Sequence, residues 1–169
     1  MVEVSAGLLM YFIDNGKVNV FLVHPGGPFW KGKDEAAWGI PKGRIEEDKE
    51  GNAEKLIDVA RREFQEETGI KLKENIDFID LSFLKRKNGK KVYVWAFLGN
   101  GSEKFIKSNE TEVEWPHKSG KIIKVPEVDK AKYFEISDAK KKIHIYQQTF
   151  LDRLKEKVKI KQVKQDKLF

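Results

Sequence analysis

The sequence predicts an α+β fold, an α/β/α sandwich in which a mixed β-sheet lies between helices. Two pairs of apolar, β-rich segments are joined by the turn sequences Asp-Asn-Gly at 14–16 and Asn-Gly at 88–89, which are typical of tight hairpins. Between the hairpins the apolar spacing changes to that of a helix. Tight hairpins make antiparallel neighbours, so this order favours a mixed sheet over a doubly wound parallel one. The predicted strands are 4–13, 18–23, 78–86 and 91–98.

Two helices are predicted. The clearer pattern covers 52–68, where apolar residues recur on one side. Gly69 is expected to end this helix, because glycine readily adopts the left-handed conformation found at many helix C-termini. A second helix is expected at about 137–158, followed by a basic tail at 159–169.

The composition indicates a single domain, 1–169, whose chemistry does not depend on sulfur. The chain has no cysteine, which excludes disulfides and thiol nucleophiles and leaves oxygen atoms or three histidines to hold a metal, so a hard cation is favoured. The net charge of +6 is explained most simply by a solvated lysine-rich surface, with a polyphosphate or nucleic-acid ligand as the alternative. No apolar run approaches the roughly 20 residues that cross a bilayer. Glu3 stands where a secretory signal carries positive charge, so we expect a cytoplasmic protein without a membrane partner.

Three glutamates on the first predicted helix are the candidate functional residues. Glu63, Glu66 and Glu67 are spaced i, i+3 and i+4, so their side chains lie on one face and repel one another. A solvated helix face with ion pairs to Arg61 and Arg62 would explain this pattern without a function. The neighbouring segments decide between the two interpretations.

Oxygen donors from other segments converge on this helix. Gly43 lies in a turn where a backbone carbonyl can point outward, and Glu54 lies near the start of the helix. Mg²⁺ binds through a few carboxylates, keeps waters and takes its other ligands from substrate phosphates. It also lowers the pKa of a bound water, which prepares that water for attack. The donors therefore predict a Mg²⁺ site, with Mn²⁺ as the alternative ion.

These residues resemble the Nudix box, the signature of the Nudix hydrolase family. The nine residues 62–70, Arg-Glu-Phe-Gln-Glu-Glu-Thr-Gly-Ile, match the end of the box, and Gly43 and Glu54 match its earlier positions. Seven residues separate Glu54 from Arg62, as in the family, but ten separate Gly43 from Glu54 where the family has five. A longer loop costs little more closure entropy, so the insertion is tolerable. It leaves Glu50 as an alternative to Glu54.

The resemblance implies roles for the box residues. Glu63, Glu66 and Glu67 would hold Mg²⁺ or act as the base, the Gly43 carbonyl would be a further ligand, and Arg62 would orient the cluster. Glu63 and Glu67 are expected as direct ligands. Glu66 either shares a metal or deprotonates water, so the identity of the base stays open.

A further acidic ligand is expected from outside the box. Glu127 is the first candidate, because it precedes a segment that resembles the late strand of the family. Glu112 and Glu114 are the other candidates, although they alternate with Val113 as residues on an exposed edge strand do.

Substrate contacts are expected from Trp30, Lys42 and Arg44. The loop 24–30 can fold over a nucleobase so that Trp30 stacks on it, although a purely structural turn is the simpler interpretation. The histidines at 117 and 144 receive no role.

The resemblance also implies a class of reaction. It implies Mg²⁺-dependent cleavage of a pyrophosphate bond in a nucleoside diphosphate linked to another moiety. A dinucleoside polyphosphate or nucleoside triphosphate is favoured, and ADP-ribose and capped RNA 5′ ends stay open. The competing class is a non-catalytic Nudix module that binds a nucleotide or RNA.

Overall fold

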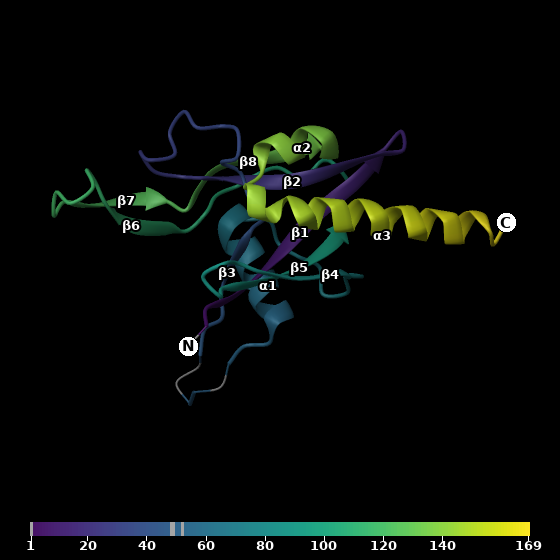
Figure 1. Cartoon of the computed structure of the whole chain (residues 1–169), viewed down its shortest axis with the longest axis horizontal. Coiled ribbons are helices and arrows are strands. Elements are labelled where there is room, and N and C mark those ends of the chain that lie inside the picture. Colours follow the sequence, from purple (N-terminus) through teal and green to yellow (C-terminus); the bar gives the residue numbers. More distant parts are fainter. Residues whose placement is uncertain (1, 48–49, 52) are drawn as a thin grey trace.

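Within the described residues, 2–47, 50–51 and 53–169, the computed structural model has a mixed six-stranded sheet with helices on both faces (Figure 1). The strands run in the order β4-β5-β1-β2-β8, and the short strand β3 pairs with β1. β1 is parallel to β5 and antiparallel to β2, which confirms the predicted mixed sheet. The strands are β1 Val4–Asp14, β2 Lys17–Pro25, β3 Lys42–Arg44, β4 Ile79–Lys85, β5 Lys91–Leu98 and β8 Val128–Glu135.

Both predicted hairpins are present. In the first, Asp14 pairs with Lys17, and the turn residues between them have positive φ, 49° at Asn15 and 75° at Gly16. Turns of this kind twist in the same sense as the paired strands, and Asn-Gly adopts them at little cost. In the second hairpin, β4 pairs antiparallel with β5, and Gly89 between them has a φ of 85°.

β1 separates two hydrophobic cores, because successive side chains of a strand point to opposite faces of the sheet. Leu8 faces helix α1, Leu56–Thr68, in a cluster that includes Phe64. Leu9 faces the C-terminal helices, in a cluster that includes Phe150. The sheet therefore lies between helices, as the alternation of strands and helices predicts.

Helix α1 carries the glutamates and begins later than predicted. It starts at Leu56, because the segment before it pairs with the loop: Ala53 bridges to Glu47, and the Glu54 N–H donates to the Glu46 carbonyl at 3.2 Å. Position 52, the predicted start, lies outside the described residues. At the other end Gly69 has a φ of 74° and its N–H donates to the Gln65 carbonyl, which confirms the predicted stop.

The single helix predicted at 137–158 is wrong. The structure has two helices, α2 Ile136–Lys142 and α3 Gln148–Asp166, with a 3-10 turn between them. The helix is interrupted because the backbone after α2 pairs with Trp38. The Trp38 N–H donates to the Lys142 carbonyl, and the His144 N–H donates to the Trp38 carbonyl. Helix α3 also runs through most of the predicted tail, and its last part extends away from the body in Figure 1.

A separate two-stranded sheet projects from the body beside the loop after β2 (Figure 1). It consists of β6, Glu110–Glu114, and β7, Ile122–Pro126, in antiparallel register. Among the described residues no helix is long and apolar enough to cross a membrane.

Candidate active site

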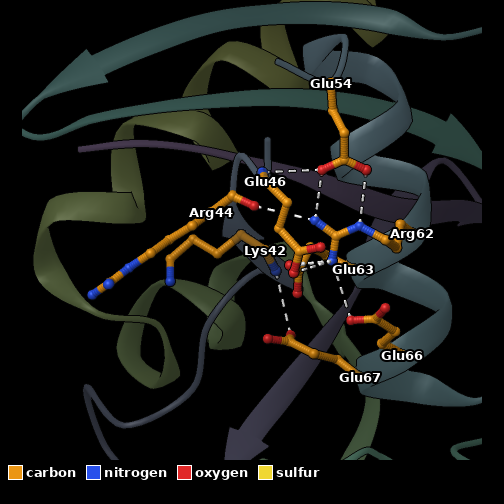
Figure 2. A network of polar contacts seen from close by, with 8 residues as sticks. All are labelled: Lys42, Arg44, Glu46, Glu54, Arg62, Glu63, Glu66 and Glu67. Carbon is orange, nitrogen blue, oxygen red and sulfur yellow. Dashed lines mark hydrogen bonds and ion pairs between the residues drawn. The ribbon is translucent and has the colours of Figure 1, made fainter. Parts of the chain in front are cut away.

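The guanidinium of Arg62 lies at the centre of a network of carboxylates from α1 and from the segment before it (Figure 2). Its Nε and Nη2 donate to the two oxygens of Glu54 at 3.1 and 3.0 Å. Its Nη1 donates to Glu63 at 2.8 Å and to Glu66 at 3.3 Å. Such planar, bidentate pairing fixes the orientation of both partners. The arrangement agrees with the expected role of Arg62, which is to orient the cluster.

The loop between Gly43 and Glu54 is hydrogen-bonded to the Arg62–Glu54 ion pair at two points. The Glu46 N–H donates to Glu54 Oε2 at 3.1 Å, and the Arg44 carbonyl accepts from Arg62 Nη2 at 3.2 Å. Hydrogen bonds from Arg62 hold the pKa of the Glu54 carboxyl below its usual range. The pKa of Arg62 is correspondingly raised, mainly by its hydrogen bond to Glu54. The longer loop therefore closes without displacing this ion pair.

Glu67 has a different environment from Glu54. Within the described part of the chain its carboxylate accepts a hydrogen bond from the Lys42 N–H at 3.3 Å, and Figure 2 shows it turned toward Lys42 instead of Arg62. Burial raises the pKa of Glu67 to about 8; the positive charge of Lys42 opposes this shift, and the negative charges of Glu63 and Glu127 add to it. A buried carboxylate among like charges favours a proton or an added cation.

Gly43 is pressed against Glu63. A Cβ built on Gly43 would lie 1.9 Å from the carboxyl carbon of Glu63, so glycine is needed for this approach. Burial raises the pKa of Glu63, and the hydrogen bond from Arg62 opposes the shift. The backbone of Gly43 and the carboxylate of Glu63 therefore lie side by side.

Glu127 joins the cluster from another segment. It lines a pocket of about 120 Å³ together with Glu67 and Lys42. Burial raises the pKa of Glu127, and the negative charge of Glu66 adds to the shift. Glu112 lies elsewhere, across from Lys124 in the hairpin β6–β7, and Glu114 accepts a hydrogen bond from the Gly120 N–H. Of the three acids outside the box, Glu127 is the one beside the box glutamates.

The same pocket contains residues to which the sequence analysis gave no role, His144 among them. His144, Tyr146 and Gln147 line it, all from the segment between α2 and α3. Burial lowers the pKa of His144, and the positive charges of Lys42 and Arg86 add to the shift. No local pattern marks this segment, because its shape depends on the pairing with Trp38.

The predicted substrate residues lie in different places. Lys42 lines the pocket with Glu67, and the ring of Trp30 packs edge-on against His144, with ring centroids 5.6 Å apart. The guanidinium of Arg44 pairs with Glu3 at 3.1 Å and is largely exposed. Two of the three predicted residues are therefore at or beside the pocket, and the side chain of Arg44 is engaged elsewhere.

The donors are suited to Mg²⁺, although the described residues form no closed cage. Among residues 2–47, 50–51 and 53–169, no three histidine or acidic side chains are already grouped as ligands of one ion. A closed cage is not what Mg²⁺ requires, because this ion takes a few carboxylates and completes its shell with waters and phosphates. The fit rests on the close approach of Gly43 to Glu63 and on the partly buried, mutually repelling acids Glu63, Glu67 and Glu127.

Comparisons with known proteins bear on the fold and the family. No curated protein matches the sequence. An Ap4A hydrolase of C. elegans, in a binary complex, is 23% identical with a TM-score of 0.56, over 91% of this chain and 97% of that one. The NUDIX domain of Shewanella oneidensis NrtR with ADP ribose is 15% identical with a TM-score of 0.58, over 94% and 89%. A mutT/nudix family protein from Listeria innocua is 12% identical with a TM-score of 0.60, over 95% and 96%.

These identities are low, so the solved structures establish the fold alone. The family model described as NUDIX domain is more specific, because it matches residues 3–154 and so includes the box, Glu127 and the start of α3. This chain belongs to the Nudix family.

Proposed function

We propose that this chain is a Mg²⁺-dependent Nudix hydrolase that cleaves a pyrophosphate bond in a nucleoside diphosphate linked to another moiety. One observation carries the proposal: Glu67 and Glu127, from separate segments, converge with Lys42 on one small pocket. Arg62 compensates the negative charge of Glu54 and part of that of Glu63. The carboxylates of Glu67 and Glu127 therefore remain available for a cation. The function is proposed for a single domain, 1–169, in the cytoplasm.

The residues in and around the pocket have separate roles in this proposal. Glu63 and Glu67, with the Gly43 carbonyl, would hold Mg²⁺ or Mn²⁺, and Glu127 would supply a further ligand. When bound, the ion neutralises phosphate oxygens and lowers the pKa of a water. The side chain of Glu66 is more exposed than that of Glu63, 35% against 12%. Glu66 either shares a metal or accepts the proton of the attacking water. Lys42 lines the pocket and balances negative charge of the substrate.

We favour a dinucleoside polyphosphate or a nucleoside triphosphate as the substrate. The likeness to an Ap4A hydrolase supports this class, and the likeness to a NUDIX domain that binds ADP ribose keeps ADP-ribose as an alternative. Capped RNA 5′ ends would present the same diphosphate linkage.

The test is phosphate or nucleotide release from these compounds with Mg²⁺, with Mn²⁺ and with EDTA. The proposal expects turnover that EDTA abolishes and that added Mg²⁺ restores. Turnover that is insensitive to EDTA, or the absence of turnover for every compound, would contradict it.

A second candidate is a non-catalytic module that binds a nucleotide or nucleic acid. The NrtR likeness favours it, because that domain is seen with ADP ribose. Salt-sensitive RNA binding, combined with no turnover in the same panel, would favour this candidate.

A further inference from the structure

A second, larger pocket lies between the loop after β2 and the hairpin β6–β7. Its volume is about 510 Å³, and its walls are largely aromatic: Phe29 and Trp30 come from the loop, and Trp115 and His117 from the hairpin. Phe29 is 55% exposed and Trp115 is 36% exposed. Large aromatic side chains that stay exposed around a cavity are a common feature of ligand sites.

The hairpin β6–β7 and the loop after β2 are in close contact. Val113 and Val125 point to the same face of the hairpin, and a Cβ on Gly27 would lie 3.3 Å from Val125. A Cβ on Gly26 would lie 2.1 Å from the carbonyl oxygen of Pro126, so only glycine permits this contact between the two backbones. The aromatic pocket is therefore a fixed feature of the packing between two segments.

The aromatic pocket adjoins the carboxylate pocket. Gly26 lines the former, and its neighbour Pro25 lines the latter. The Gly26 N–H donates to the carbonyl of Glu127 at 3.0 Å, and Glu127 lines the carboxylate pocket with Glu67. A ligand whose one end lies among the aromatic rings can therefore place its other end beside the glutamates.

The two pockets differ in their basic residues. No lysine or arginine is among the described residues that line the aromatic pocket, which includes the acidic residue Glu114, whereas Lys42 lines the carboxylate pocket. Lys33 lies outside the lining and covers the ring of Phe29, with its Nζ 3.3 Å from the ring centroid. Trp30 and Trp115 are thus the larger rings on which a flat, uncharged group can stack. The volume also falls in the range of about 300–1,000 Å³ that holds small-molecule ligands.

We propose that the aromatic pocket binds the heteroaromatic base of the substrate, with Trp115 stacking on it, while the attached phosphates extend into the carboxylate pocket. This inference rests on the proposed function, because it makes the preferred substrate a nucleotide and not a base-free polyphosphate. It assigns the projecting hairpin β6–β7 to substrate recognition.

The kinetic test compares Trp115→Ala and Trp115→Phe with the wild-type chain on diadenosine tetraphosphate, ATP and inorganic tripolyphosphate. Base stacking on one aromatic side chain typically changes affinity by about tenfold or more. Trp115→Ala is expected to raise KM for the nucleotides by about that factor with little change in kcat, and Trp115→Phe to retain most of the affinity. Tripolyphosphate hydrolysis, where present, should not respond. Ile160→Ala is the control, because Ile160 is 49% exposed on α3 and lines neither pocket.

The second measurement does not require catalysis. Adenosine is added to the ¹⁵N-labelled chain, and the four indole N–H signals are followed. The signals of Trp30 and Trp115 should shift, and that of Trp95 should not. An unchanged nucleotide KM in Trp115→Ala, or the absence of these shifts, would overturn the inference and leave the hydrolase proposal intact. Shifts without hydrolysis of any nucleotide would retain the base pocket and reject the hydrolase.

Discussion

Glu54 and Glu67 lie on opposite sides of the same glutamate network, and their charges are balanced in opposite ways. Glu54 receives two hydrogen bonds from Arg62, which hold its pKa below the usual range. Glu67 is partly buried beside other acids, and this environment raises its pKa to about 8. The charge of Glu54 is thus compensated within the protein, whereas the charge of Glu67 calls for a cation from outside. The network has a structural side and, in the proposed function, a metal-binding side.

The largest effect is expected when the metal-binding side loses a charge. Glu67→Gln should lower kcat by about 10²–10⁴-fold, because it removes either a ligand or a base. Steady-state hydrolysis with saturating Mg²⁺ measures the change, and Glu156→Gln, on the exposed face of α3, is the control. Near-normal kcat in Glu67→Gln would remove Glu67 from the chemistry.

Gly43→Ala tests the geometry of the same side without changing a charge. The new methyl group would occupy the space of the Glu63 carboxylate, which must move away. Because a displacement of about 1 Å can cost about 10²-fold in rate, kcat/KM should fall by roughly that factor. The melting temperature should change little, since the far end of a flexible side chain can shift. A variant with full activity would show that this close approach is not needed.

A smaller effect is expected at Glu127, which would support the box from outside. Glu127→Gln should lower kcat/KM by about 10–100-fold, the range seen when residues that support a metal site are changed. Glu112→Gln is the matched comparison, because Glu112 lies across from Lys124 in the hairpin. Equal activities of the two variants would contradict the ranking of these acids.

The pH dependence of stability separates the two sides most directly. In metal-free protein, protonated Glu67 contributes to the free energy of unfolding because its pKa is raised. This contribution is complete below about pH 4.5 and is lost as the pH rises through about 8. Unfolding free energy should therefore fall between pH 5 and 9, by on the order of 1–3 kcal/mol, and Glu67→Gln should flatten this decline. Glu54 behaves oppositely, because its pKa is lowered. Its contribution to the free energy of unfolding is present above its usual pKa and is lost as the pH falls through the lowered pKa. Glu54→Gln should therefore reduce the loss of stability at acid pH. Urea titrations across this pH range, with EDTA present, check both signs.

Local patterns were sufficient for much of the fold and for part of the site. The spacing of Glu63, Glu66 and Glu67 places them on one face wherever a helix forms, and the Asn-Gly turns enforce their hairpins regardless of the rest of the chain. Gly69 ends α1 for an equally local reason. Such features depend on a few consecutive residues, so the sequence alone predicts them.

Features that depend on distant segments were missed. The helix predicted at 137–158 is interrupted because Trp38 pairs with the backbone around Ile143. No sequence pattern near Ile143 predicts this pairing. The break places Tyr146 and Gln147 in the carboxylate pocket, so they were missed with it. Glu127 was ranked first by resemblance, but its distance from α1 in sequence conceals its position beside Glu67.

The backbone around Trp38 is held by residues near the end of the chain. The Ile40 N–H donates to the side chain of Gln147 at 2.9 Å, in addition to the pairing of Trp38 with the segment after α2. On the ribosome, α1 and its glutamates are synthesised long before Gln147. A chain that stops before Gln147 therefore carries the acidic residues without the wall that completes their pocket.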